Sequence, residues 1–236
     1  MSRDETVIEE LHEATQRLVR TIDAVTDEEY AAASGLPDWS RAHVVAHLAL
    51  NGEGLSGALT GVVQGEPVAM YASQERRDSD IEELAGAEPT LLRERLLRST
   101  TLLADALAAV PEEAWSTRIE RTPGSDRTFS AYAVPGMRLR EVEIHHADLG
   151  LGYTRADWPV SFGARLLDAM VKRDGWAEPF TAAPVDLDRT WQCGDVAEGS
   201  PTVSGTAADL AWWLTGRGDG DGLTSDSGDL PRIEEW

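Results

Sequence analysis

The chain has 236 residues, 42% of them hydrophobic, and a formal net charge of −21, which is compatible with one large or two small globular domains. The negative charge excludes nucleic acid and anionic membranes as expected partners, and it means that an anionic substrate would need a local basic pocket. The one cysteine, Cys193, excludes an intrachain disulfide, and the absence of any run of 18 apolar residues excludes a transmembrane helix.

The N-terminal segment is acidic and amphipathic, with apolar residues at helical spacing over residues 6–24. It lacks the basic and apolar stretches of a signal peptide, so we expect a cytoplasmic protein. Thr26 and Glu29 form the pattern of a capping box, which predicts a short helical turn after the first helix.

The following segments predict further helices of an antiparallel bundle. Helices are expected over residues 40–65, 75–85 and 89–107, a short turn over 111–115, and a turn cluster over 122–127. The last helix of this part covers residues 130–149, and Pro135 and Gly136 inside it predict a kink or a late start. Helix bundles of this kind can hold metal ions between inward-facing side chains of neighbouring helices.

After Gly150 the sequence pattern changes from long helical segments to short helix-like and strand-like segments. This pattern predicts a small second domain of mixed helix and strand. Helices are expected over residues 158–173 and 207–215, strands over 185–191 and 201–205, a glycine-rich loop over 216–222, and a further strand in the tail over 230–236. The chain is therefore predicted to be an α+β protein with domains at residues 1–152 and 153–236.

Two pairs of side chains four residues apart are the strongest candidates for chemistry. His43 and His47 share one face of a predicted helix, and Glu141 and His145 share one face of another. If the two helices pack together, these four side chains can surround one metal ion. Zinc accepts histidine nitrogen and carboxylate oxygen, and a catalytic zinc site typically has three protein ligands and one open position.

The neighbours of these pairs have less specific interpretations. Glu143 is expected to be solvated, and His146 is expected either to support a ligand or to lie on the surface. Asp148 could accept a hydrogen bond from the second nitrogen of a ligand histidine, although a helix-terminal role is favoured. Cys193 has no partner for nucleophilic catalysis in the sequence pattern, so a structural role is expected.

Two blocks of sequence resemble the mycothiol-dependent maleylpyruvate isomerases, which belong to the DinB-like superfamily of helix bundles. The specific blocks are residues 36–51 and residues 137–150, and the supporting blocks are residues 70–77, 203–205 and 216–222. The similarity extends over the whole chain. It implies a DinB-like antiparallel four-helix bundle in residues 1–152 and a small α+β domain in residues 153–236.

The resemblance also implies roles for individual residues. It implies a zinc ion, or another divalent metal, bound by His47, Glu141 and His145, whereas His43 matches a position that is not a ligand. Arg77 and Arg217 match catalytic arginines that hold the carboxylates of the substrate, and a guanidinium suits a carboxylate geometrically.

The implied reaction converts maleylpyruvate to fumarylpyruvate through a metal-bound thiolate adduct, with mycothiol as the thiol cosubstrate. One alternative is a mycothiol S-transferase that conjugates the thiol to an electrophile, and a second is a non-catalytic metal-binding module. Pro135 and Gly136 depart from the larger residues of the family pattern, which we expect to widen the pocket. The acidic surface favours a monomer.

Overall fold

The computed structural model describes residues 4–66, 68–173 and 176–233. The chain divides into two compact units, Met1–Gly152 and Tyr153–Trp236, which are described separately below. Helices dominate the first unit, and the second combines helices with a small sheet. This composition confirms the predicted α+β class.

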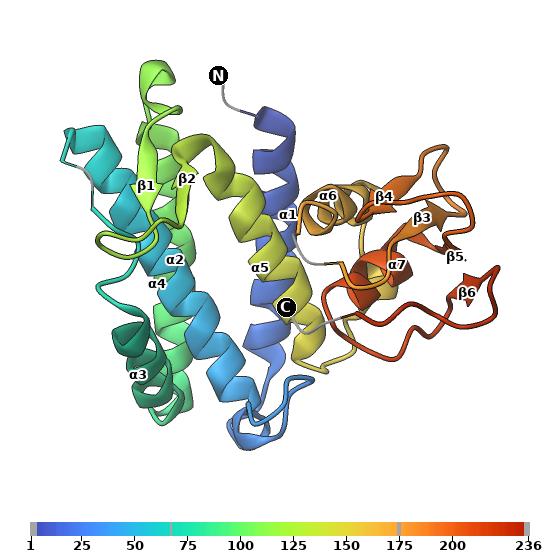
Figure 1. Cartoon of the computed structure of the whole chain (residues 1–236). Coiled ribbons are helices and arrows are strands. Elements are labelled where there is room, and N and C mark those ends of the chain that lie inside the picture. Colours follow the sequence, from blue (N-terminus) through green and yellow to red (C-terminus); the bar gives the residue numbers. More distant parts are fainter. Residues whose placement is uncertain (1–3, 67, 174–175, 234–236) are drawn as a thin grey trace. The chain divides into compact units, whose positions relative to one another are not determined.

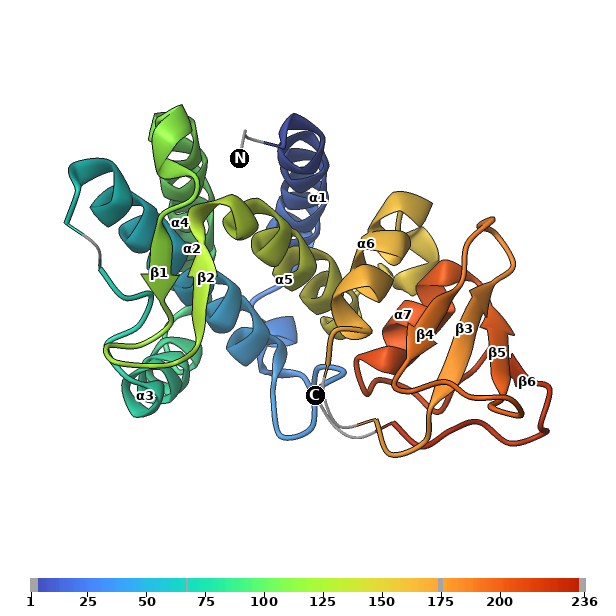
Figure 2. The same ribbon diagram turned by 45° about the horizontal axis from the view of Figure 1, so that its top comes forward.

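The first unit is a bundle of four long helices with a shorter helix beside it (Figure 1). The long helices are α1 (Glu5–Ala24), α2 (Arg41–Gln64), α4 (Pro89–Ala109) and α5 (Val134–Asp148), and the shorter one is α3 (Gln74–Ala85). Helix α2 packs against both α4 and α5, and α1 packs against α5. In the tilted view of Figure 2, α5 lies between α1 and α2, in agreement with the packing of α5 against both helices.

Helix α1 shows how the sequence pattern produces this packing. Its buried side chains recur every three or four residues, and they are Val7, Leu11, Ala14, Leu18 and Ile22. The stripe faces the bundle core, and each fully buried aliphatic side chain contributes about 1.5–3 kcal/mol relative to an exposed one. Asp4 caps the helix by accepting a hydrogen bond from the backbone N–H of Val7 at 3.2 Å.

Helix α2 is the central element of the bundle and is buried on most of its surface. A Cβ atom added at Gly52 would lie 2.9 Å from Ser99 Oγ, so glycine permits the close approach of α2 and α4. The helix ends at Gly65, whose φ of 71° lies in the left-handed region. The predicted start and end of this helix are therefore confirmed.

The sequence did not predict a short antiparallel hairpin that precedes α5. Its strands are β1 (Arg118–Glu120) and β2 (Thr128–Ser130). Strands of three residues are too short to show a clear alternation of polar and apolar residues, and only the turn between them was expected. Met70 N donates to Glu120 O at 3.0 Å and Tyr71 N donates to Arg121 O at 2.9 Å, so the hairpin fixes the segment after α2.

Helix α5 begins late, as the proline in the expected helix predicted. Pro135 occupies its first turn, where no intrahelical donor is lost. Short 3-10 helices occur at η1 (Glu28–Ala31), η2 (Glu112–Ala114), η3 (Ala131–Ala133) and η4 (Arg155–Asp157). The turn predicted from the capping box of Thr26 and Glu29 corresponds to η1.

The described residues of the second unit form two α-helices and a four-stranded sheet in the order β4-β3-β5-β6. Its elements are α6 (Val160–Met170), β3 (Phe180–Pro184), β4 (Trp191–Cys193), β5 (Thr202–Gly205), α7 (Ala207–Leu214) and β6 (Thr224–Ser225). Strand β3 pairs antiparallel with β4 and parallel with β5, and β6 is antiparallel to β5. The predicted β5, α6 and α7 are confirmed.

Two strand predictions in this unit are wrong. The alternating segment 185–191 is mostly a turn, because Val185 is 73% exposed and Asp186 Oδ1 accepts a hydrogen bond from Ala207 N at the start of α7. Among the described tail residues 230–233 there is no strand, and 234–236 lie outside the described residues. Residues 224–225 form the edge strand instead.

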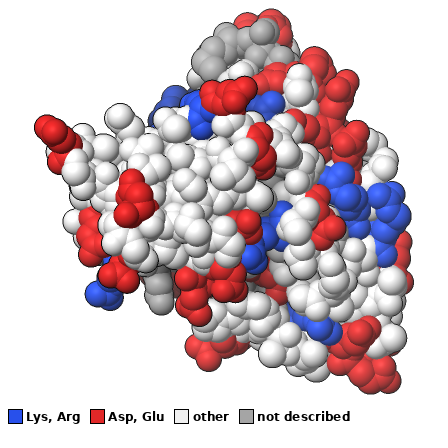
Figure 3. All heavy atoms as spheres, turned by 90° about the vertical axis from the view of Figure 1, so that its right-hand side faces the viewer, with Lys and Arg blue, Asp and Glu red and all other residues white. Residues whose placement is uncertain are grey.

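Acidic side chains are dispersed over the face shown in Figure 3, whereas basic side chains gather in a few groups. The excess of acidic side chains agrees with the net charge of −21. No helix in the part of the chain that the structure describes is long and apolar enough to cross a lipid bilayer.

Candidate functional site

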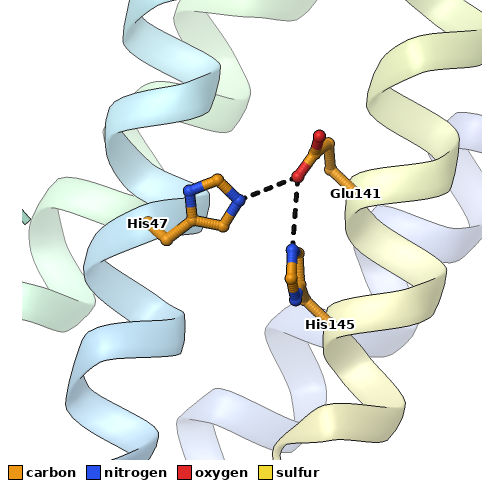
Figure 4. A group of neighbouring side chains, drawn as sticks. All are labelled: His47, Glu141 and His145. Atoms are coloured by element: carbon orange, nitrogen blue, oxygen red, sulfur yellow. Dashed lines mark hydrogen bonds and ion pairs between the residues drawn. The ribbon is translucent and has the colours of Figure 1, made fainter. Parts of the chain in front are cut away.

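Three of the four candidate side chains meet between α2 and α5 (Figure 4). His47 projects from α2, and Glu141 and His145 project from one face of α5. Glu141 Oε2 lies 2.8 Å from His47 Nε2 and 3.3 Å from His145 Nε2. The two imidazole rings meet edge to face, with their centroids 4.7 Å apart. Both histidines therefore direct the same ring nitrogen at one carboxylate oxygen.

His43 does not join this group. Its Nδ1 accepts hydrogen bonds from Ser40 N at 3.2 Å and from Ser40 Oγ at 2.7 Å, which completes the capping box of α2. Its Nε2 lies 3.3 Å from Glu82 Oε2 on α3. His43 does lie one turn before His47 on the same helix, as predicted. Its side chain, however, caps the start of α2 and contacts α3 instead of the cluster.

The donor set of the three-residue cluster suits a divalent metal ion. One ligand atom from each of His47, Glu141 and His145 can be chosen so that all three lie within 4.8 Å of one another. Two imidazole nitrogens and one carboxylate oxygen suit zinc, and three protein ligands leave a position for a further ligand. Nickel and cobalt also accept such ligands.

Burial and hydrogen bonds shift the pKa values of all three cluster residues. Burial lowers the pKa of His47 to about 4, so its imidazole is neutral at pH 7 and able to ligate a metal. Burial alone would raise the pKa of Glu141, but hydrogen bonds from His145 and His47 hold that pKa well below its usual value. Burial would also lower the pKa of His145, yet its hydrogen bonds to Asp148 and Glu141 outweigh burial and raise it.

Asp148 holds the ring of His145 in place. Its Oδ2 lies 2.8 Å from His145 Nδ1, and the side chain is buried, with 1% of the residue exposed. Asp148 is also the last residue of α5, so the favoured interpretation as a mere helix-terminal residue was incomplete. A carboxylate on the second nitrogen fixes the tautomer of a ligand histidine and increases its basicity.

We expect Asp148→Asn to weaken metal binding by about 10–100-fold, because the amide no longer supports the protonated Nδ1 of His145. A chelator-competition titration of zinc measures this affinity. Asp105→Asn on the exposed face of α4 is the matched control and should leave the affinity unchanged. Equal zinc affinity of Asp148→Asn and the wild type would contradict this role of Asp148.

The expectations for Glu143 and His146 are wrong, because both side chains are buried, each with 1% exposure. They face α1 instead of solvent. Glu143 Oε1 accepts a hydrogen bond from Arg17 Nη2 at 2.7 Å, and His146 Nε2 lies 2.7 Å from Thr21 Oγ1. The sequence of α5 does not reveal this contact, since only the packing of α1 covers that face.

Arg77 contacts the cluster from α3. Its Nη2 donates to His47 Nδ1 at 3.1 Å, and its Nη1 donates to Asp78 Oδ1 at 2.8 Å. Arginine has no acceptor, so His47 Nδ1 must accept and His47 Nε2 must carry the proton directed at Glu141. The structure therefore brings Arg77 together with one of the three cluster residues.

Arg217 belongs to the second unit and is described within it. It lies between Gly216 and Gly218, whose φ values of 75° and 69° are left-handed and allow a tight change of chain direction. Its guanidinium lies 5.6 Å from the ring centroid of Trp212, and its Nη1 donates to Thr215 O at 3.4 Å. These contacts fix the side chain at the C-terminal end of α7.

Sequence reasoning missed the surroundings of Tyr71. The ring of Tyr71 lies 6.0 Å from Cζ of Arg77 and 5.4 Å from Cζ of Arg121. Burial raises the pKa of Tyr71, so the phenol keeps its proton at neutral pH. Arg121 follows β1 in a turn, where no periodic pattern marks its side chain, and the hairpin that carries it was not predicted.

A Cβ atom added at Gly136 would meet nothing within 4 Å, and the expected widening of the pocket by Pro135 and Gly136 stays a prediction. Cys193, by contrast, is fully buried on β4, and burial raises the pKa of its thiol to about 12. A thiol with such a pKa stays protonated, which supports the expected structural role.

A four-helix bundle with a histidine–glutamate–histidine cluster between two helices defines a class of candidate metalloproteins. The model of the mycothiol maleylpyruvate isomerase N-terminal domain matches residues 11–150, and that of the MDMPI C-terminal domain matches residues 157–235. The chain belongs to the mycothiol-dependent maleylpyruvate isomerase family, which confirms the resemblance found in the sequence.

Two solved structures have the same fold. They are crystal structures of a mycothiol-dependent maleylpyruvate isomerase and of a mutant of that enzyme with one histidine replaced by alanine. Each is 28% identical to this chain, with a TM-score of 0.89, and the match covers 98% of this chain and 96% of the other. A search of curated proteins gives no match.

Proposed function

We propose that this protein is a mycothiol-dependent isomerase that converts maleylpyruvate to fumarylpyruvate, with a divalent metal at the cluster of His47, Glu141 and His145. The observation that carries the proposal is this buried donor cluster in a chain whose two units both match the isomerase family. The proposed chemistry needs a metal site, for which the cluster is suited, an anion-binding group, for which Arg77 is suited, and a thiol, which mycothiol would supply.

The residues present fit a metal ion. The carboxylate of Glu141 and the Nε2 atoms of His47 and His145 already converge, and Asp148 supports His145 from behind. His145 lies between the carboxylates of Asp148 and Glu141, and a divalent cation would supply positive charge beside them. Zinc is the first choice for this donor set.

When bound, zinc would keep the sulfur of mycothiol in the thiolate form at neutral pH. Addition of this thiolate to the conjugated double bond forms a carbon–sulfur bond and moves the electron pair toward the carbonyl oxygen. The former double bond is then a single bond that can rotate. Return of the electron pair expels the thiolate and yields the trans isomer, so the thiol is regenerated and no redox partner is needed.

Arg77 is suited to respond to metal loading. Its present hydrogen bond requires an unprotonated Nδ1 on His47. If Nε2 of His47 binds a metal, a neutral imidazole carries its proton on Nδ1 and no longer accepts from Arg77. The guanidinium then becomes available for a carboxylate or for the negative charge that develops during addition.

Arg217 is proposed as the second arginine for this substrate. A net charge of −21 makes the field of the whole protein unfavourable for a dianion. Fixed guanidinium groups can compensate locally, and arginine matches carboxylate geometry in a bidentate manner. The contact of Arg217 with Trp212 already restricts this long side chain. Arg217 therefore loses less conformational entropy when it binds a substrate.

A mycothiol S-transferase would use the same metal and thiol but would release the conjugate. No observation on this chain favours that outcome or a metal-binding module without turnover, whereas both matched structures are of an isomerase. The cytoplasmic location and the monomeric state stay predictions.

The proposal is tested on the purified protein by metal analysis and a coupled assay. We expect about one zinc per chain, conversion of maleylpyruvate in the presence of catalytic mycothiol, and little conversion with glutathione. Chelation should abolish activity and zinc should restore it, because the cluster offers the only thiol-activating group in the proposal. Consumption of mycothiol in proportion to product would indicate the transferase reaction, and a protein without stoichiometric metal would overturn the scheme.

A further inference from the structure

Two guanidinium groups lie near one aromatic ring beside the metal cluster. Cζ of Arg121 lies 5.4 Å and Cζ of Arg77 lies 6.0 Å from the ring centroid of Tyr71. Like charges repel, so such a pair is costly unless the ring and an anion compensate for it. The arrangement is notable in a chain with 42 acidic and only 21 basic residues.

Arg121 differs from Arg77 in its partners. Arg77 already contacts Asp78 and His47, whereas no carboxylate of the described residues lies within ion-pair distance of Arg121. Its guanidinium lies over the ring of Tyr71, with Cζ 5.4 Å from the ring centroid. The N–H donors of a guanidinium match the geometry of a planar carboxylate.

The backbone holds Arg121 in position. Arg121 N donates to Arg127 O at 2.9 Å across the hairpin, and Arg121 O accepts from Tyr71 N at 2.9 Å. Two backbone hydrogen bonds and the ring contact make Arg121 better ordered than an arginine on a free loop tip. A preorganised cation loses less conformational entropy when it binds a ligand.

Arg77 connects this arginine pair to the candidate reaction centre. The same guanidinium lies near Tyr71, and its Nη2 lies 3.1 Å from Nδ1 of His47 in the metal cluster. A carboxylate held between Arg77 and Arg121 would therefore lie next to the cluster and within the same unit of the chain. It would give Arg121 the carboxylate partner that it lacks among the described residues.

We propose that Arg121, with Tyr71 and Arg77, forms a carboxylate subsite of the first unit, and that Arg121 is a specificity-determining residue for dicarboxylate substrates. This proposal rests on the proposed function for the identity of the substrate, but the anion site itself does not need turnover. Arg121 binds one carboxylate and takes no part in proton transfer or in thiol addition.

The test compares Arg121→Gln with Arg127→Gln, which removes the same charge from an exposed position on the same hairpin. With saturating mycothiol, we expect Arg121→Gln to raise KM for maleylpyruvate about 10-fold or more, as expected for a lost hydrogen bond to a charged group. The value of kcat and the zinc content should change little, and Arg121→Lys should recover part of the loss. Arg127→Gln should behave like the wild type.

Calorimetric titration of the zinc-loaded protein with maleate and its monoamide gives a readout that is independent of turnover. The wild type should prefer the dianion, and Arg121→Gln should reduce this preference about 10-fold, since it removes the group that reads the second carboxylate. An unchanged preference, or an equal loss in Arg127→Gln, would overturn the proposal. If the wild type does not convert maleylpyruvate, the proposed function is wrong. The titration still shows whether Arg121 binds a carboxylate, because it does not require turnover.

Discussion

Replacing His47 by alanine is expected to remove stoichiometric zinc and to reduce isomerase activity to below about 1% of the wild type. Loss of a group that only supports a metal ligand costs about 10–100-fold, and loss of a ligand should cost more. His47 is the only cluster residue from α2, so its removal leaves both remaining donors on α5. Metal analysis of the purified variant and the coupled isomerase assay measure the two effects.

His43→Ala is a demanding control, because it makes the same change one helical turn earlier on the same helix. His43 contacts Ser40 and Glu82, and it contributes no ligand atom to the cluster. We expect it to retain zinc and activity while losing about 0.5–2 kcal/mol of stability through the weakened cap. Full activity of His47→Ala, or loss of zinc in His43→Ala, would reverse the assignment of the two histidines.

The long helices could be predicted because each carries its own signals. The apolar stripe of α1, Ser40 before α2 and Gly65 after it are all local features of the sequence. The β1–β2 hairpin and the end of β3 at Pro184 depend on contacts with distant segments. Alternation of apolar residues over 185–191 was misleading, since Val185 has no neighbour that covers it.

Among the residues around the candidate site, some could likewise be predicted from local sequence, whereas others depend on contacts with distant segments. The spacing of Glu141 and His145 placed them on one face of a helix, and that is a property of the helix alone. Glu143 is buried against Arg17, which lies more than a hundred positions away in the sequence, so its burial could not be predicted from α5 alone. The convergence of His47 on the same point, and the approach of Arg121 to Tyr71, also require the tertiary fold.

Arg217→Ala is expected to lower kcat/KM for maleylpyruvate about 10–150-fold without changing zinc content. Loss of a hydrogen bond between charged groups costs about 1.5–3 kcal/mol, which corresponds to this range. The metal cluster lies entirely in the first unit, so a change in the second unit should not disturb the ligands. Arg217→Lys keeps the charge but loses the planar pair of donors, and it should recover only part of the activity.

Arg189→Ala provides the comparison within the second unit, because its side chain is 59% exposed and pairs with Asp168 near the surface. Arg189→Ala removes the same charge as Arg217→Ala. A general effect of net charge on an anionic substrate would therefore lower kcat/KM equally in both variants. We expect Arg189→Ala to retain nearly full activity, since a single exposed charge is screened by salt. Equal kinetics of Arg217→Ala and the wild type would exclude Arg217 from the site and leave carboxylate binding to the arginines of the first unit.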